Sequence, residues 1–214
     1  MKNVPDSGAN RVPWLTVERL GAICDGVIAI IITLLVLEIK VPEGHDFSAG
    51  GVVSFMHKAS RDIMVYLLNF ALIGMFWLQH HVIFHYVHRT NRVFIFLNGL
   101  FLFLLSLSPF STSLVGTYRG VKPAEFVFGV NFLLSGLTLL VIWRYLAKNE
   151  TLQRKPIPMR VVRSMSRRIM IAPIVILVGM FVSLINFHVA ALIYFTAPAY
   201  YLKHWLVDTS WQDE

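Results

Sequence analysis

The chain has 214 residues, of which 56% are hydrophobic and only 14% are charged, and its net charge is +7. A soluble domain of this length does not bury so much apolar surface, so the composition predicts an integral membrane protein. The apolar runs are continuous rather than alternating, which favours helices over a barrel. The basic residues lie between these runs and form no recognisable nucleic-acid-binding module, so we expect no nucleic-acid partner.

Six transmembrane helices are predicted, within one membrane domain that covers residues 1–214. Each apolar run is close to the length of about 20 residues that crosses a bilayer. The predicted spans are 15–39, 63–87, 93–118, 124–146, 169–186 and 189–207. In the long connection after the first span, residues 52–59 are expected to form a short helix at the membrane interface.

The positions of the basic residues predict that both termini are cytoplasmic. With the N-terminus inside, fourteen of the 19 Lys and Arg residues lie on the inner side and five on the outer side, as the positive-inside rule requires. The inner connection 148–168 is rich in arginine, and we expect it to form a basic amphipathic helix that contacts anionic lipid headgroups. The chain is therefore expected to be a multi-pass protein of the cell membrane, as in a bacterial inner membrane.

The first span contains a carboxylate, Asp25, less than two turns from its inner end. An ionisable group inside a membrane is costly unless it has a partner or faces water, so Asp25 is a candidate functional residue. Counted from the inner basic residues, Asp25, His80 and Asn98 all lie about 9–13 Å into the membrane. We therefore predict a polar network of Arg19, Asp25, Trp77, His80 and Asn98. This network either joins the helices or fixes the first helix at the mouth of a pathway.

Two further interpretations of the second span remain open. His81, His85 and His88 are spaced to share one helix face, which is an arrangement that can bind Zn²⁺ or non-haem iron. A metal site of this kind needs further ligands from other segments, and the histidines of the other segments lie outside or elsewhere, so we expect neither a metal cofactor nor an enzyme. Alternatively, Asp25 and the second-span histidines form the proton relay of a proton-coupled secondary transporter. Against this stands the lack of an inverted repeat or of a pair of broken spans.

The first span also carries a stripe at helical spacing that is made of Ile30, Leu34 and Leu37, with Thr33 beside it. Because this helix is apolar on all sides, periodicity alone does not say whether the stripe faces lipid or a pore.

The segment Arg19-Leu-Gly-Ala-Ile-Cys-Asp25 resembles the signature of the lysosomal-type potassium channel family (transmembrane protein 175) and its bacterial homologues. That signature is Arg, three residues, then Phe-Ser-Asp. The chain departs from it where Ile23 and Cys24 replace Phe and Ser. Cys24 is a poor hydrogen-bond partner, so the hydrogen bonds of the inner network are expected to differ here from those of the family. The resemblance continues at Trp77, His80, Phe84, Asn98 and Ser108-Pro109-Phe110.

The resemblance implies an all-α homotetramer in which the first helices line a central pore without a carbonyl filter. It implies that apolar rings at Ile30, Leu34 and Leu37 constrict this pore and that the hydroxyl of Thr33 contributes to potassium preference. The expected function is passive conduction of K⁺, with weak selectivity over Na⁺, through a pore whose apolar rings gate by dewetting. No cofactor is expected, and the permeant ion is K⁺.

Overall fold

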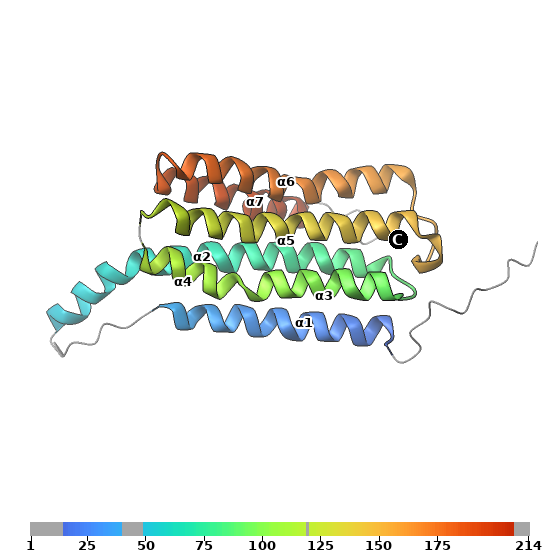
Figure 1. Ribbon diagram of the computed structural model, residues 1–214, viewed down its shortest axis with the longest axis horizontal. Coiled ribbons are helices and arrows are strands. Elements are labelled where there is room, and N and C mark those ends of the chain that lie inside the picture. Colours follow the sequence, from blue (N-terminus) through green and yellow to red (C-terminus); the bar gives the residue numbers. More distant parts are fainter. Residues whose placement is uncertain (1–14, 40–48, 119, 208–214) are drawn as a thin grey trace, which may run out of the picture.

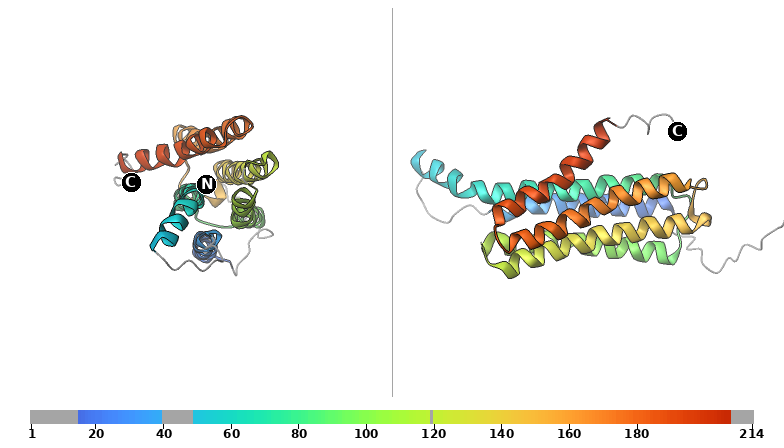
Figure 2. Two further views of the ribbon diagram at one scale, coloured as in Figure 1. Left: turned by 90° about the vertical axis from the view of Figure 1, so that its left-hand side faces the viewer. Right: turned by 90° about the horizontal axis from the view of Figure 1, so that it is seen from above.

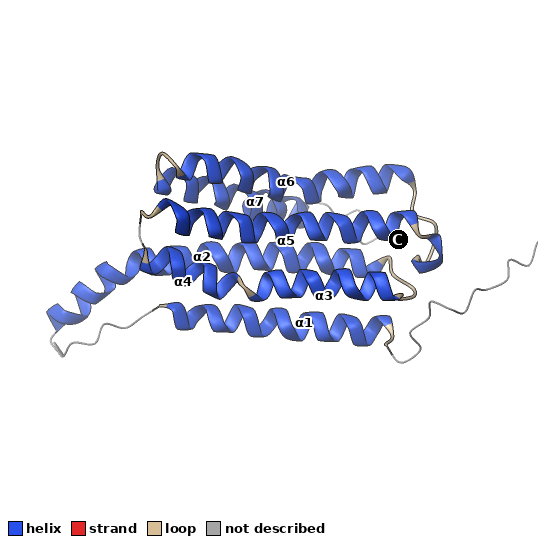
Figure 3. Cartoon of the chain, viewed as in Figure 1, coloured by secondary structure: helices blue, strands red, loops and turns tan. Residues whose placement is uncertain are grey.

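The computed structural model describes residues 15–39, 49–118 and 120–207, which form a bundle of long helices (Figure 1). Within these residues the regular structure is helical, apart from an isolated bridge between Val87 and Gln153 (Figure 3). The continuous apolar runs correctly predicted this fold class, because a helix satisfies its own backbone hydrogen bonds within the membrane.

The described helices, in chain order, are α1 (Val17–Leu34), the 3₁₀ turn η2 (Leu35–Glu38), α2 (Ala49–His85), α3 (Arg92–Ser106), α4 (Ser108–Thr117), α5 (Lys122–Lys148), the 3₁₀ turn η3 (Glu150–Leu152), α6 (Met159–Ser183) and α7 (Phe187–Val207). Among the described residues, five helical segments are long and apolar enough to cross a membrane: Val17–Glu38, Asp62–His85, Arg92–Thr117, Lys122–Lys148 and Met159–Ser183. The sixth predicted span, 189–207, is helical as part of α7 but is not among these five. Helix α7 contains His188, Pro198 and Lys203 among its apolar residues.

Two helices begin earlier than predicted. Helix α2 has 37 residues and includes 52–59, which therefore continue the second span instead of forming a separate interface helix. Helix α6 begins at Met159, so the connection 148–168 is not one amphipathic helix: η3 and an extended stretch come first. Pro156 and Pro158 explain why the helix does not begin nearer to residue 148, because a helix interior does not accommodate a residue that lacks an N–H.

The third predicted span is broken at Leu107, between α3 and α4. Pro109, in the first turn of α4, has no N–H to donate to the preceding turn. Asn131 of α5 reaches the break, where its Nδ2 donates to the carbonyl oxygen of Leu104 at 2.8 Å. The neighbouring helix thus satisfies a carbonyl beside the break, as is expected for proline within a membrane span.

Helix α1 lies at one edge of the bundle, where it contacts α2, α3 and α4 (Figure 1). Helix α5 packs against α3, α4 and α6, and α6 and α7 lie on the side away from α1. The C-terminal half of α7 leaves the bundle at an angle (Figure 2, right). The interior is filled by fully buried aromatic side chains, namely Phe76, Phe101, Phe132 and Trp143. Phe76 stacks on Phe132 with ring centroids 6.3 Å apart.

One end of the bundle holds the starts of α1, α3 and α6 and the ends of α2 and α5 (Figure 1, right). We call this end the basic end, because its described residues include Arg19, Arg89, Arg92, Arg144, Lys148, Arg154, Lys155, Arg160, Arg163 and Arg167. The other end, where η2 lies, is called the η2 end.

Candidate functional site

Helix α1 begins with a side-chain cap and is attached to the next connection. Thr16 is the N-cap, and its hydroxyl oxygen accepts a hydrogen bond from the backbone N–H of Arg19 at 3.3 Å. The hydroxyl of Thr90, in the connection between α2 and α3, donates to the carbonyl of Leu15 at 2.8 Å. Gly21 of α1 faces Phe84 of α2, and a Cβ at this position would make an ordinary van der Waals contact with the Phe84 ring at 3.5 Å.

The two faces of α1 differ sharply in burial. The face toward the bundle is buried and consists of Leu20, Cys24, Ile28, Ile31 and Leu35. The opposite face is exposed and apolar, and it contains Ile23, Ile30, Leu34 and Leu37. The predicted stripe of Ile30, Leu34 and Leu37 therefore points away from the rest of the subunit.

The hydroxyl of Thr33 lies on the same exposed side of α1. It donates to the carbonyl oxygen of Ile30 at 2.8 Å, one turn earlier in the helix. This bond satisfies the hydroxyl hydrogen and leaves the oxygen as an acceptor. Thr33 thus presents a polar oxygen within an otherwise apolar surface.

Asp25 is exposed on α1 and is bonded to α2. The indole Nε1–H of Trp77 donates to Asp25 Oδ1 at 2.9 Å, and the Trp77 side chain is 36% exposed. The indole group is a donor only, so it matches a carboxylate that can only accept. The bond joins the candidate pore-lining helix to its neighbour at the surface of the subunit.

His80 and Asn98 form a second, fully buried pair between α2 and α3. His80 Nε2 lies 2.9 Å from Asn98 Oδ1, and Asn98 Nδ2 donates to the carbonyl of Phe94 at 2.7 Å. The imidazole stacks on Phe101, with ring centroids 5.4 Å apart, and also contacts Phe84. Four of the five side chains of the predicted network are therefore brought together in two separate pairs.

The structure does not bring Arg19 to these pairs. Six residues separate Arg19 from Asp25, which places them about 120° apart around an α-helix. Among the described residues, the guanidinium of Arg19 bonds to no side chain of the pairs. The two departures from the family signature also separate, because Cys24 is fully buried against the bundle whereas Ile23 is exposed beside the candidate stripe.

The three histidines of the second span do not share one helix face. Helix α2 ends at His85, and His88 follows in the connection, where its backbone N–H donates to the carbonyl of Leu152 at 2.7 Å. Among the described residues, no group of three or more His, Cys, Asp or Glu side chains could hold a metal ion. The expectation of an aligned histidine face was wrong, because it assumed that the helix continued to His88.

At the η2 end, a cavity lies beside the end of α1. Its polar lining includes Glu38 of η2, Asp62 and Tyr66 of α2, and Thr112 of α4. The sequence analysis did not single out these carboxylates. Both carboxylates lie at the edges of apolar spans, and this position is the signal in the sequence that would have found them.

Comparison with known proteins shows which family shares these features. The family model described as endosomal/lysosomal potassium channel TMEM175 matches residues 19–109. A potassium channel of Chamaesiphon minutus is 32% identical over 186 residues, which is 86% of this chain and 92% of that protein. The human endosomal/lysosomal proton channel TMEM175 is 35% identical over 92 residues, which is 40% of this chain and 18% of that protein.

A solved structure agrees over most of the chain. The crystal structure of a lysosomal potassium-selective channel TMEM175 homologue from Chamaesiphon minutus covers 88% of this chain with a TM-score of 0.76 and 30% identity. The match includes 97% of that chain. The helical arrangement described above is thus the arrangement found in that channel.

Proposed function

The chain belongs to the endosomal/lysosomal potassium channel TMEM175 family, and from this premise we propose that it conducts K⁺ passively across the cell membrane. The family and the names of its bacterial members support an ion channel and confirm the resemblance recognised in the first three spans. The relatives are channels rather than enzymes, in agreement with the expectation that the chain is not an enzyme.

The observation that carries the proposal is the exposed surface of α1. One side of this surface carries the apolar stripe, and another side, about 140° around the helix from Ile30, carries an exposed carboxylate, Asp25, at membrane depth. A charged group at the centre of a lipid-facing helix costs about 2.5–3.5 kcal/mol on insertion scales. The side of α1 that carries Asp25 is therefore better suited to water or to another subunit than to lipid. Since aromatic rings fill the interior of one subunit, the pathway in this proposal runs between copies, with four α1 helices around it.

In this arrangement the rings at Ile30, Leu34 and Leu37 form the constriction. A ring of apolar side chains excludes water and ions when it is narrow and admits a partly hydrated ion when it widens. The oxygen of Thr33 lies next to the Ile30 ring and favours K⁺, which loses its hydration shell at less cost than Na⁺. Selectivity is expected to be weak, because no ring of carbonyls replaces the water around the ion. The basic end faces the cytoplasm, in agreement with the positive-inside rule.

The test is to make the narrowest ring polar. Ile30→Asn is expected to raise the basal K⁺ current of the reconstituted channel, because a polar ring retains water in the closed state. Ile174→Asn on α6 is the matched control, since Ile174 is 55% exposed and Ile30 is 59% exposed, and it lies on the opposite side of the bundle. Unchanged current in Ile30→Asn, or an equal rise in both variants, would show that Ile30 is not the constriction.

A second candidate function is proton conduction, which the names of the animal relatives favour. In the transporter alternative, a proton passes between Asp25 and His80, yet these groups belong to separate hydrogen-bonded pairs. Proton conduction along the α1 surface needs no such transfer. A pH gradient imposed with equal K⁺ on both sides distinguishes these functions. A current that reverses near the proton equilibrium potential supports conduction, whereas saturable flux without unitary currents supports the coupled transporter.

A further inference from the structure

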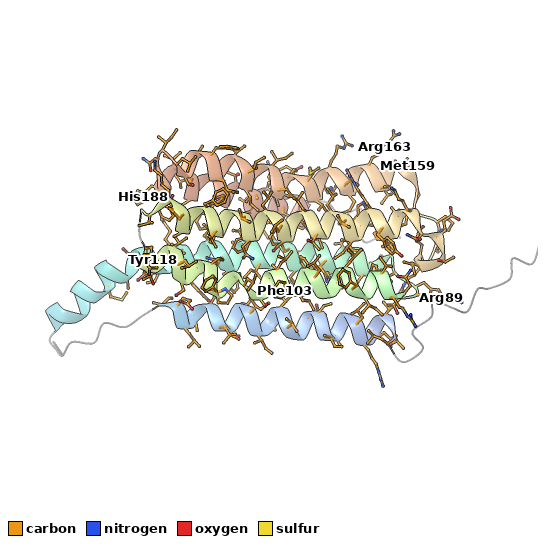
Figure 4. All side chains as sticks on the ribbon, viewed as in Figure 1. Arg89, Phe103, Tyr118, Met159, Arg163 and His188 are labelled. Atoms are coloured by element: carbon orange, nitrogen blue, oxygen red, sulfur yellow. The ribbon has the colours of Figure 1, made fainter. Side chains whose placement is uncertain are left out.

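Helix α6 presents one outward face over nearly its whole length. Towards the basic end this face carries three exposed arginines, Arg160, Arg163 and Arg167. Further along it carries exposed apolar side chains, namely Ile174, Val178 and Phe181. The spacings of three, four and seven residues place these side chains on one side of an α-helix. In Figure 4, Arg163 projects from α6 away from the bundle.

Helix α5 also presents an exposed stripe with an apolar part and a basic part, but along the chain its apolar part comes first and its basic part last. Its exposed apolar side chains are Val127, Leu134, Leu137 and Val141. They are followed at the basic end by Arg144 and Lys148, which are also exposed and continue the same spacing. Since α5 and α6 pack side by side and run antiparallel, their basic segments lie at the same end of the bundle.

The lengths of these two stripes approach the thickness of the hydrocarbon core of a bilayer, so the acyl chains of one lipid would cover the half of each stripe nearer the basic end. From Arg144 to Val127 is about 26 Å along the helix, and from Arg167 to Phe181 is about 21 Å, at a rise of about 1.5 Å per residue. The hydrocarbon core of a bilayer is about 30 Å thick, and long basic side chains extend toward the headgroups from just inside it. The charged groups of both helices therefore lie at the level of one leaflet's phosphates.

We propose that the basic ends of α5 and α6 together bind the headgroup of an anionic phospholipid, whose acyl chains lie along the two apolar stripes. Arginine fits this role because its planar guanidinium binds phosphate oxygens in a bidentate manner. The inference rests on the proposed function in one respect, namely that the α1 side faces the pathway and the α5–α6 side faces lipid. It retains the lipid contact expected for 148–168, but it places the charges on two packed helices rather than on a separate amphipathic helix.

The test measures lipid binding directly, without any current. Native mass spectrometry of the purified protein counts bound phosphatidylglycerol and phosphatidylcholine with identical acyl chains. The wild type is expected to bind phosphatidylglycerol preferentially, and Arg163→Gln/Arg167→Gln is expected to weaken that binding at least about tenfold, since each basic group near a membrane surface contributes about a fivefold effect. Phosphatidylcholine binding is expected to stay unchanged.

One control variant and one further test variant make the experiment specific. Arg89→Gln/Arg92→Gln removes the same charge from exposed residues at the same end, but outside the two stripes, and is expected to retain phosphatidylglycerol. Arg144→Gln/Lys148→Gln, on α5, is expected to weaken binding as the α6 variant does. Equal retention of both lipids by the wild type, or an equal loss in the Arg89/Arg92 variant, would overturn the proposal. An unaffected α5 variant would overturn the two-helix site, and absent channel currents would leave the lipid result standing.

Discussion

The buried hydrogen bond between His80 and Asn98 is expected to stabilise the packing of α2 on α3 by about 1–2 kcal/mol. Asn98→Leu leaves the imidazole without a partner at a site where neither side chain is more than 2% exposed. An unsatisfied buried polar group costs about 1–3 kcal/mol, and measured side-chain bonds between membrane helices average about 0.6 and reach about 1.7 kcal/mol. The single variant should therefore lose about 2 kcal/mol.

A double-mutant cycle separates the hydrogen bond from the loss of packing. His80→Phe keeps a flat ring between Phe84 and Phe101, and His80→Phe combined with Asn98→Leu removes both polar partners. Unfolding free energies of the purified protein in detergent should give a coupling of about 1–2 kcal/mol. A coupling below about 0.3 kcal/mol, which is the usual limit of additivity, would refute the reasoning, because the two side chains would then act independently.

Other variants test the surface pair and the tightest helix contact. Trp77→Phe removes the donor to Asp25 and is expected to lower the yield of the assembled oligomer in size-exclusion chromatography, whereas Trp77→Phe with unchanged assembly would show that this bond does not position α1. Gly179→Ala is expected to lower the unfolding temperature, at a cost of about 1–3 kcal/mol from overpacking, because its Cβ would lie 2.2 Å from Cε1 of Tyr194. Gly99→Ala is the control, since nothing lies within 4 Å of the new Cβ, and equal losses in both would contradict the packing argument.

The apolar runs predicted which segments are helical, but not where the helices end. Their composition is dominated by side chains that suit a membrane helix, so each core of a span was evident. Helix ends depend on local features that are weaker in the sequence, such as Pro158 before α6 and the break at Leu107 before Pro109. Residues 52–59 were separated from the second span because they are less apolar, yet the backbone continues through them as one helix.

For the candidate site, the sequence predicted how deep each polar side chain lies in the membrane, but not how each helix is rotated about its own axis. Counting residues from the basic boundary placed Asp25, His80 and Asn98 at one level, and the structure places each of them at a contact between helices. Which side chains meet depends on how each helix is turned about its axis. That rotation separates Asp25 with Trp77 from His80 with Asn98, and it turns Arg19 away. The exposure of the α1 stripe likewise needed the packed bundle, since this helix is apolar on every side.

The most direct test of passive potassium conduction is a recording from the purified protein in a planar lipid bilayer, with K⁺ on one side and Na⁺ on the other. The account predicts unitary currents whose reversal potential lies toward the potassium equilibrium potential, with a modest displacement because apolar rings discriminate weakly. Flux that appears only with a proton gradient, saturates with substrate and shows no unitary events would contradict the account and favour the proton-coupled transporter.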